Sequence, residues 1–208
     1  MKTIPFIFSL GFIFNLLHSI PTYGEESGSA KDVTARLEQL FEASKKVNLE
    51  GDEKQKAIEV IENAMDWDKI AQVCLGAKQA KKNSGKNFEE FRNLLKDVIT
   101  RTAFTRLDKF WQGSAKYKFE KIEVTGNNAK VPTKFFVKGE PFELEYYFSK
   151  KGSEWLIYDI SYEEVRYSTN ISQQIESFLR EGDFTTLLSK LKKRRDDLIE
   201  ATSKSKKT

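Results

Sequence analysis

Apolar residues recur with the period of an α-helix through the first half of the chain. They predict four helices, over residues 32–41, 52–65, 70–75 and 87–111. Asp32 stands where the first of these helices would be capped, and Gly76 stands where the third would end. The segment 78–86 is polar and rich in lysine, and we expect it to connect the third and fourth helices.

After residue 116 the apolar positions alternate with polar ones, which is the period of a β-strand. The alternation predicts four strands, over residues 117–124, 129–137, 142–148 and 155–160. Short turns that contain glycine separate these strands. Successive strands are therefore expected to form hairpins, and together an antiparallel meander.

Two further helices are predicted over residues 168–181 and 183–198. Ser168 or Asn170 would cap the first, and Asp183 would cap the second, after a stop at Gly182. The order of helices, meander and helices predicts an α+β fold. We expect one domain over 32–200, in which helices pack on one curved antiparallel meander sheet of about four strands and enclose an apolar pocket. A frayed polar tail would follow over 201–208.

The first 24 residues have the pattern of a secretory signal peptide. Lys2 is followed by an apolar stretch over 6–17, and small residues precede the bond after Gly24. The apolar stretch is shorter than the roughly 20 residues that a membrane-spanning helix needs. We therefore expect cleavage after Gly24, export from the cytoplasm, and a flexible linker over 25–31.

Composition excludes several classes of function. The 35 basic and 31 acidic residues leave a net charge of only +4, which does not favour nucleic acid as a partner. The single cysteine, Cys74, excludes an internal disulfide, and in an apolar helix it is expected to pack rather than to act as a nucleophile. The single histidine, His18, would be lost with the signal peptide, so the exported chain would lack imidazole for a hydrolase, a zinc site or haem. We expect neither enzyme activity nor a metal or cofactor.

Large apolar side chains would line the expected pocket. Phe142, Leu144, Tyr146 and Phe148 share one strand face by parity, and on the next strand Tyr158 and Ile160 share a face. The expected lining residues are Phe91, Val98, Leu107, Phe142, Leu144, Tyr146, Phe148, Tyr158, Ile160, Val165, Ile171, Ile175 and Phe178. The same pattern is typical of a filled core, so it does not decide whether the interior is empty.

Polar residues suggest alternatives. Asp159 lies beside Tyr158 in an apolar strand, where the pair would supply an acid or base in a small isomerase-like enzyme. An aspartate in such a place more often bonds a backbone group or a basic side chain. Glu163 and Glu164 are an adjacent acidic pair of the kind that faces water. The basic run 190–195 indicates a solvated helix face, with docking on anionic headgroups or an acidic partner as the alternative.

Four stretches of the chain, taken in order, resemble the MlaC family of periplasmic phospholipid-binding proteins, also called the toluene-tolerance auxiliary family. The stretches are 65–76 (MDWDKIAQVCLG), 88–95 (FEEFRNLL), 155–160 (WLIYDI) and 175–188 (IESFLREGDFTTLL). The resemblance covers about residues 33–198. The chain departs from the family where Glu164-Val165-Arg166 replaces the usual Gly-Val-Ser, and where the lysine-rich segment 78–86 replaces an aromatic residue.

The resemblance implies a monomeric carrier whose cargo is a phospholipid held by its acyl chains. It implies two partners, an inner-membrane ABC transporter with a lipid-binding domain and an outer-membrane lipoprotein complex. Two hypotheses stay open beside the carrier. One is an envelope interaction module with a packed core, and the other is the enzyme that uses Asp159 and a tyrosine.

Overall fold

The computed structural model describes residues 28–112 and 115–205 of the chain. The predicted signal peptide over 1–24 lies outside these residues. The described part begins with five helices: α1 (Gly28–Ser44), α2 (Asp52–Asn63), α3 (Trp67–Leu75), α4 (Ala77–Lys82) and α5 (Lys86–Gln112). Six strands follow: β1 (Lys116–Phe119), β2 (Glu123–Thr125), β3 (Asn128–Val137), β4 (Glu140–Lys151), β5 (Glu154–Tyr162) and β6 (Val165–Arg166). The helices α6 (Tyr167–Glu181) and α7 (Phe184–Ser205) complete it.

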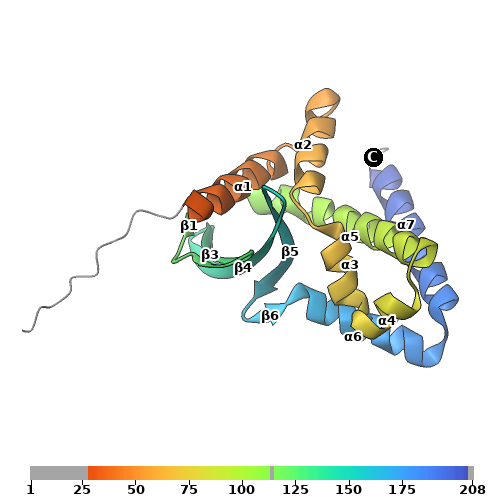
Figure 1. Cartoon of the computed structure of the whole chain (residues 1–208). Helices are drawn as coiled ribbons and strands as arrows, with labels where there is room; N and C mark the ends of the chain where they lie inside the picture. Colours follow the sequence, from red (N-terminus) through yellow and green to blue (C-terminus); the bar gives the residue numbers. More distant parts are fainter. Residues whose placement is uncertain (1–27, 113–114, 206–208) are drawn as a thin grey trace, which may run out of the picture.

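The strands form one antiparallel sheet in the order β1-β3-β4-β5-β6, and β2 also pairs with β3 (Figure 1). The hairpin of β3 and β4 is its longest ladder and runs from the pair Asn128 and Ser149 to the pair Val137 and Glu140. Helices lie on this sheet as the sequence predicts, which confirms the α+β fold. The described part has six strands rather than about four.

The predicted strand over 117–124 is two strands because of Pro132 in β3. Proline has no N–H, so it cannot donate a hydrogen bond to a neighbouring strand. Pairing with β1 stops at Thr133 and pairing with β2 resumes at Lys130. Between these pairs the Glu120 N–H donates to the Pro132 carbonyl over 2.9 Å.

A second irregularity lies in β5. Phe148 pairs with Ile157, whereas its neighbour Tyr147 pairs with Asp159. Tyr158 is therefore the extra residue of a β-bulge. An extra residue reverses the alternation of side chains beyond it. Ile157 and Ile160, which pair with Phe148 and Tyr146, consequently lie on the same face of the sheet. The expectation that Tyr158 and Ile160 share a face is wrong for this reason.

Two apolar clusters form the core. The first lies between the sheet and the helices α1, α2 and the second half of α5, and we call it the sheet cluster. The second lies among α3, α4, α6, α7 and the first half of α5, and we call it the helix cluster. The helix α5 has 27 residues, which is about 40 Å at 1.5 Å per residue. It runs from the sheet to the helices α4 and α7 (Figure 1), and its side chains contribute to both clusters.

Other helix boundaries differ from the sequence expectations. The segment 78–86 was expected to be a connection, but α4 occupies Ala77–Lys82. The helix α1 begins at Gly28, inside the expected linker, and α7 continues to Ser205, into the expected frayed tail. The expected Asp183 cap is confirmed, because its Oδ1 accepts from the Thr186 N–H over 2.8 Å.

The cap of α6 comes from the sheet rather than from Ser168 or Asn170. The Asp159 carboxylate on β5 accepts from the Ser168 N–H over 3.1 Å and from the Ser168 hydroxyl over 2.6 Å. The Arg166 guanidinium lies 3.7 Å from the same carboxylate, whose side chain is only 2% exposed. An acceptor aimed at the first N–H groups of a helix is a cap. This cap fixes the start of α6 against β5.

We predict that Asp159→Ala lowers the free energy of unfolding by about 2 kcal/mol, because it removes a cap and leaves buried donors of Ser168 unpaired. Asp159→Asn keeps one acceptor oxygen and should cost less. Urea unfolding followed by circular dichroism measures both. An Asp159→Ala protein as stable as the wild type would contradict the cap.

Burial of Cys74 gives a second prediction. The side chain is fully buried in the helix cluster, and burial is the largest cause that raises the pKa of its thiol to about 12. The thiol is therefore neutral in the folded protein near pH 8, and only a thiolate reacts rapidly with thiol reagents. A chromogenic disulfide reagent should label Cys74 in urea but not in the native protein. Labelling of the native protein at the unfolded rate would contradict this burial.

Candidate functional site

One face of the sheet presents a continuous layer of apolar side chains to the helices. The strand pairing places Phe142, Leu144, Tyr146 and Phe148 on this face, as the parity of the sequence predicts. Phe41 of α1 lies at the centre of the layer. Its ring centroid is 4.7 Å from that of Tyr117, and the ring also contacts those of Trp111, Phe119, Phe135 and Tyr146.

Burial in this layer falls along β4. Phe148 is fully buried and Tyr146 is nearly so, whereas Leu144 and Phe142 are half-buried. Because Tyr146 is buried, the pKa of its hydroxyl is raised above the ordinary value. The gradient continues to Tyr162, which is 50% exposed and whose ring centroid lies 6.3 Å from that of Phe142. The layer is thus fully buried at the Phe148 end and half-buried at the Phe142 end, and we call these its closed end and its open end.

The helix α5 covers the open end with large side chains that are themselves only half-buried. They are Phe104, Leu107, Phe110 and Trp111. The rings of Phe110 and Phe142 lie 6.0 Å apart, centroid to centroid. Half-buried apolar groups on two facing elements leave apolar surface that a guest molecule would cover favourably.

The structure divides the expected pocket residues between two places. Six of them belong to the sheet cluster: Leu107, Phe142, Leu144, Tyr146, Phe148 and Ile160. Four belong to the helix cluster: Phe91, Ile171, Ile175 and Phe178. Three belong to neither: Val98, Tyr158 and Val165. Sequence parity found the β4 residues, but the apolar stripe of a helix does not say which neighbour it faces.

Sequence reasoning missed several members of the layer. Phe41, Phe135, Tyr117 and Phe110 all contribute rings to it. The alternation of apolar residues over 129–137 is a signal that could have identified Phe135. It places Val131, Thr133 and Phe135 on one face of β3, where they pair with Tyr146, Leu144 and Phe142 of β4.

The opposite side of the sheet is polar. The Glu145 carboxylate accepts from the hydroxyls of Tyr147 (2.6 Å) and Ser161 (2.9 Å), and from the Lys130 ammonium (3.2 Å). These bonds, the one from Tyr147 above all, hold the pKa of Glu145 below its ordinary value against the opposing effect of burial. The Arg166 guanidinium stacks 3.9 Å from the centroid of the Tyr147 ring. The group is a fully paired structural network.

In this structure Asp159 and Tyr158, the two residues proposed for an enzyme, both make structural contacts. Asp159 caps α6 and also accepts from the Ile160 N–H over 3.0 Å. Tyr158 lies under the Lys69 ammonium, which is 3.7 Å from its ring centroid. Burial lowers the pKa of Lys69. The interpretation of Asp159 as a partner of backbone and basic groups is therefore confirmed by its contacts.

The β5–β6 hairpin carries the departure from the usual Gly-Val-Ser. Tyr162 pairs with Val165, so Glu163 and Glu164 form a two-residue turn, and both have positive φ (49° and 65°). Such turns favour glycine or asparagine. Both glutamates are exposed, as the sequence predicts for an acidic pair that faces water.

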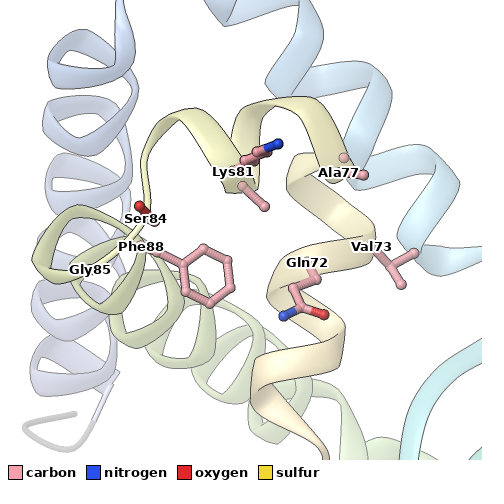
Figure 2. A pocket seen from close by; sticks show the side chains of 9 residues that line it. Gln72, Val73, Ala77, Lys81, Ser84, Gly85 and Phe88 are labelled. Carbon is pink, nitrogen blue, oxygen red and sulfur yellow. The ribbon is translucent and has the colours of Figure 1, made fainter.

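Two of the hollows on the surface have no residue of the sheet in their lining. One of about 600 Å³ lies between α3, α4 and the start of α5, where Val73, Ala77 and Phe88 contribute to its wall (Figure 2). Another of about 420 Å³ lies between α1 and α2. None of the expected pocket residues lines either hollow.

Over 28–112 and 115–205, no three His, Cys, Asp or Glu side chains come together as a metal site. Within the same ranges, no helix combines the length and the apolar character that crossing a bilayer requires.

Comparison with known proteins places this architecture. No curated protein sequence matches the chain. A solved structure of a phospholipid-binding protein from Ralstonia solanacearum, in complex with a phospholipid, matches with a TM-score of 0.67. The two sequences are 17% identical, and the match covers 81% of this chain and 97% of that chain. The family model described as MlaC protein matches residues 30–193. The chain therefore belongs to the MlaC family.

Proposed function

We propose that this protein binds a phospholipid by its acyl chains in the apolar layer between the sheet and the helices α1 and α5. The observation that carries the proposal is the fall in burial along β4, from the fully buried Phe148 to the half-buried Phe142. A layer that is closed at one end and open at the other is suited to a ligand with an apolar tail and a polar head. The match to a phospholipid-binding protein of the same fold supports this proposal.

The physical chemistry of lipids explains why such a carrier would be needed. Burying one methylene contributes about 0.8 kcal/mol, so exposing a chain of about 16 carbons to water costs roughly 12 kcal/mol. Spontaneous transfer of a two-chain lipid out of a membrane and through water is therefore very slow. A protein that covers the chains removes this cost and needs no catalytic group. Asp159 and Cys74, the strongest catalytic candidates, have structural surroundings here.

We propose further that the protein acts in the periplasm, after a signal peptide over 1–24 is removed. There it would carry phospholipid as a monomer between an outer-membrane lipoprotein complex and an inner-membrane ABC transporter with a lipid-binding domain. The MlaC family match supports this placement. In this role the protein would contribute to outer-membrane lipid asymmetry and toluene tolerance, as the family resemblance implies.

An interaction module with a packed core is the second candidate. The complete burial of Phe148, Phe135 and Val131 favours it at the closed end of the layer. The half-buried residues at the open end favour the carrier. The two candidates differ in whether a molecule occupies the layer.

Native mass spectrometry tests this difference directly. The exported chain, residues 25–208, should be purified from a bacterial periplasm without detergent, and the carrier should retain one diacyl phospholipid per protein. Organic extraction would identify it. A protein that carries no bound lipid, and that also takes none from added vesicles, would contradict the carrier proposal and favour the interaction module with a packed core.

A pair of tryptophan substitutions tests the location of the site. Leu144→Trp adds volume at the half-buried open end, so it should lower lipid occupancy severalfold with little loss of stability. Ile175→Trp is the matched control, because Ile175 is only 3% exposed and packs in the helix cluster. Overpacking there should cost about 1–3 kcal/mol of stability without a selective loss of lipid.

Lipid content per folded protein and urea unfolding are the two measurements. The location is wrong if occupancy in both variants follows only the loss of stability. It is also wrong if Ile175→Trp empties the protein more than Leu144→Trp does at equal stability.

A further inference from the structure

The region around α4 carries unbalanced positive charge. From 77 to 88 the chain has four lysines and no acidic residue. Lys78, Lys81, Lys82 and Lys86 are exposed, and none forms an ion pair with a side chain that the structure describes. We call these four residues the α4 patch.

The nearest acidic residues along the chain, Glu89 and Glu90, line a hollow together with Lys86 and Asp97, but none of these carboxylates forms an ion pair with Lys86. Glu89 lies 3.7 Å from the Arg92 guanidinium and Glu90 lies 2.5 Å from the Lys192 ammonium. The basic run over 190–195 differs from the α4 patch in its ion pairs. Three of its residues pair with an acidic side chain: Lys190, Lys192 and Arg195.

Apolar surface adjoins the patch. The 600 Å³ hollow is lined by Val73, Ala77, Ala80 and Phe88, with Lys81 beside them (Figure 2). Val73 is 37% exposed although it is a large apolar residue. The hollow between α1 and α2 offers a contrast, because Glu42 and Glu53 line it together with Lys46 and Lys56. Its charge is balanced, whereas that of the α4 patch is not.

We propose that the α4 patch docks the protein on the surface of an anionic phospholipid bilayer. Clusters of four or more lysines next to exposed apolar side chains are a known basis of attraction to anionic lipid surfaces. A protein partner is less favoured by composition, since lysine is depleted in protein interfaces and arginine and aromatic residues are enriched. The segment 77–88 has four lysines and no arginine, tyrosine or tryptophan, and Phe88 is its single aromatic residue.

Docking of this kind is weak and reversible, which suits a carrier. Each lysine near an anionic surface contributes about 1 kcal/mol, which is roughly fivefold in affinity. The attraction falls off within a Debye length of about 8 Å at physiological ionic strength. The inference extends the proposed carrier function, but it rests on a different surface from the apolar layer.

Vesicle co-sedimentation tests the proposal with the exported chain. The probes are vesicles of phosphatidylcholine alone and vesicles with about one third phosphatidylglycerol. We expect binding to the anionic vesicles only, and its loss near 1 M salt, where the Debye length is about 3 Å. The double variant Lys81→Gln/Lys82→Gln should weaken this binding roughly 25-fold.

A matched control has the same change in charge elsewhere. Lys46→Gln/Lys56→Gln alters two exposed lysines beside the balanced hollow, so binding should stay within about twofold of the wild type. Val73→Ser should weaken binding without changing its salt dependence, because it removes only apolar surface. Urea unfolding of each variant shows that the protein stays folded.

Several outcomes would overturn the proposal. They are failure to sediment with anionic vesicles at low salt, equal losses in the two double variants, and unchanged binding of Lys81→Gln/Lys82→Gln. Salt-sensitive binding of an acidic protein through Lys81 and Lys82, without vesicle binding, would identify a protein docking site instead. Phospholipid retained by each variant is measured separately, so failure of the docking proposal and failure of the carrier proposal give different results.

Discussion

One face of the antiparallel sheet is apolar and has to be covered, and in this protein α1 and α5 cover it. Everything else in the fold follows from how they do so. Phe41 of α1 seals the middle of the layer with contacts to five aromatic rings. The helix α5 covers the remainder with side chains that stay half-buried. The cover is complete at one end of β4 and incomplete at the other, and the proposed function depends on that difference.

The second requirement is that the helix cluster keeps a fixed position relative to the sheet. Two sets of contacts hold it. The Asp159 carboxylate on β5 caps α6, and the segment before α3 pairs with β5 through the Asp66 N–H and the Ile157 carbonyl, 2.8 Å apart. The Ser149 hydroxyl of β4 also donates to the Asp66 carboxylate over 3.4 Å. Two buried aspartates thus anchor both α3 and α6 to the sheet, which gives them structural roles.

Much of the fold could be predicted from the sequence, because periodicity within one element is a local property. The long helix α5, the hairpin of β3 and β4, and the cap at Asp183 all follow from local patterns. The exceptions depend on distant residues. Pro132 interrupts the neighbouring strand that pairs with β3. The bulge at Tyr158 is defined only by the pairing of β5 with β4, and the residue that caps α6 lies on β5, outside the helix. Only part of the candidate site could be predicted. Strand parity is local and identifies the β4 residues, whereas the neighbours of Phe91 and Ile175 are set by helix packing, which the sequence pattern does not give.

The interruption at Pro132 also shapes the outer boundary of the sheet. The strands beside β3 have only four and three residues. At the other boundary β6 pairs with the last two residues of β5, and the segment before α3 bonds to the backbone of Ile157 in the middle of β5. A long unpaired edge would be a template on which another chain could add a strand and begin to aggregate. Lys116 and Lys118 place positive charge on β1, which opposes such pairing further. A sheet with a strongly apolar face is thereby left without a long, continuous unpaired edge on which a second copy could add a strand.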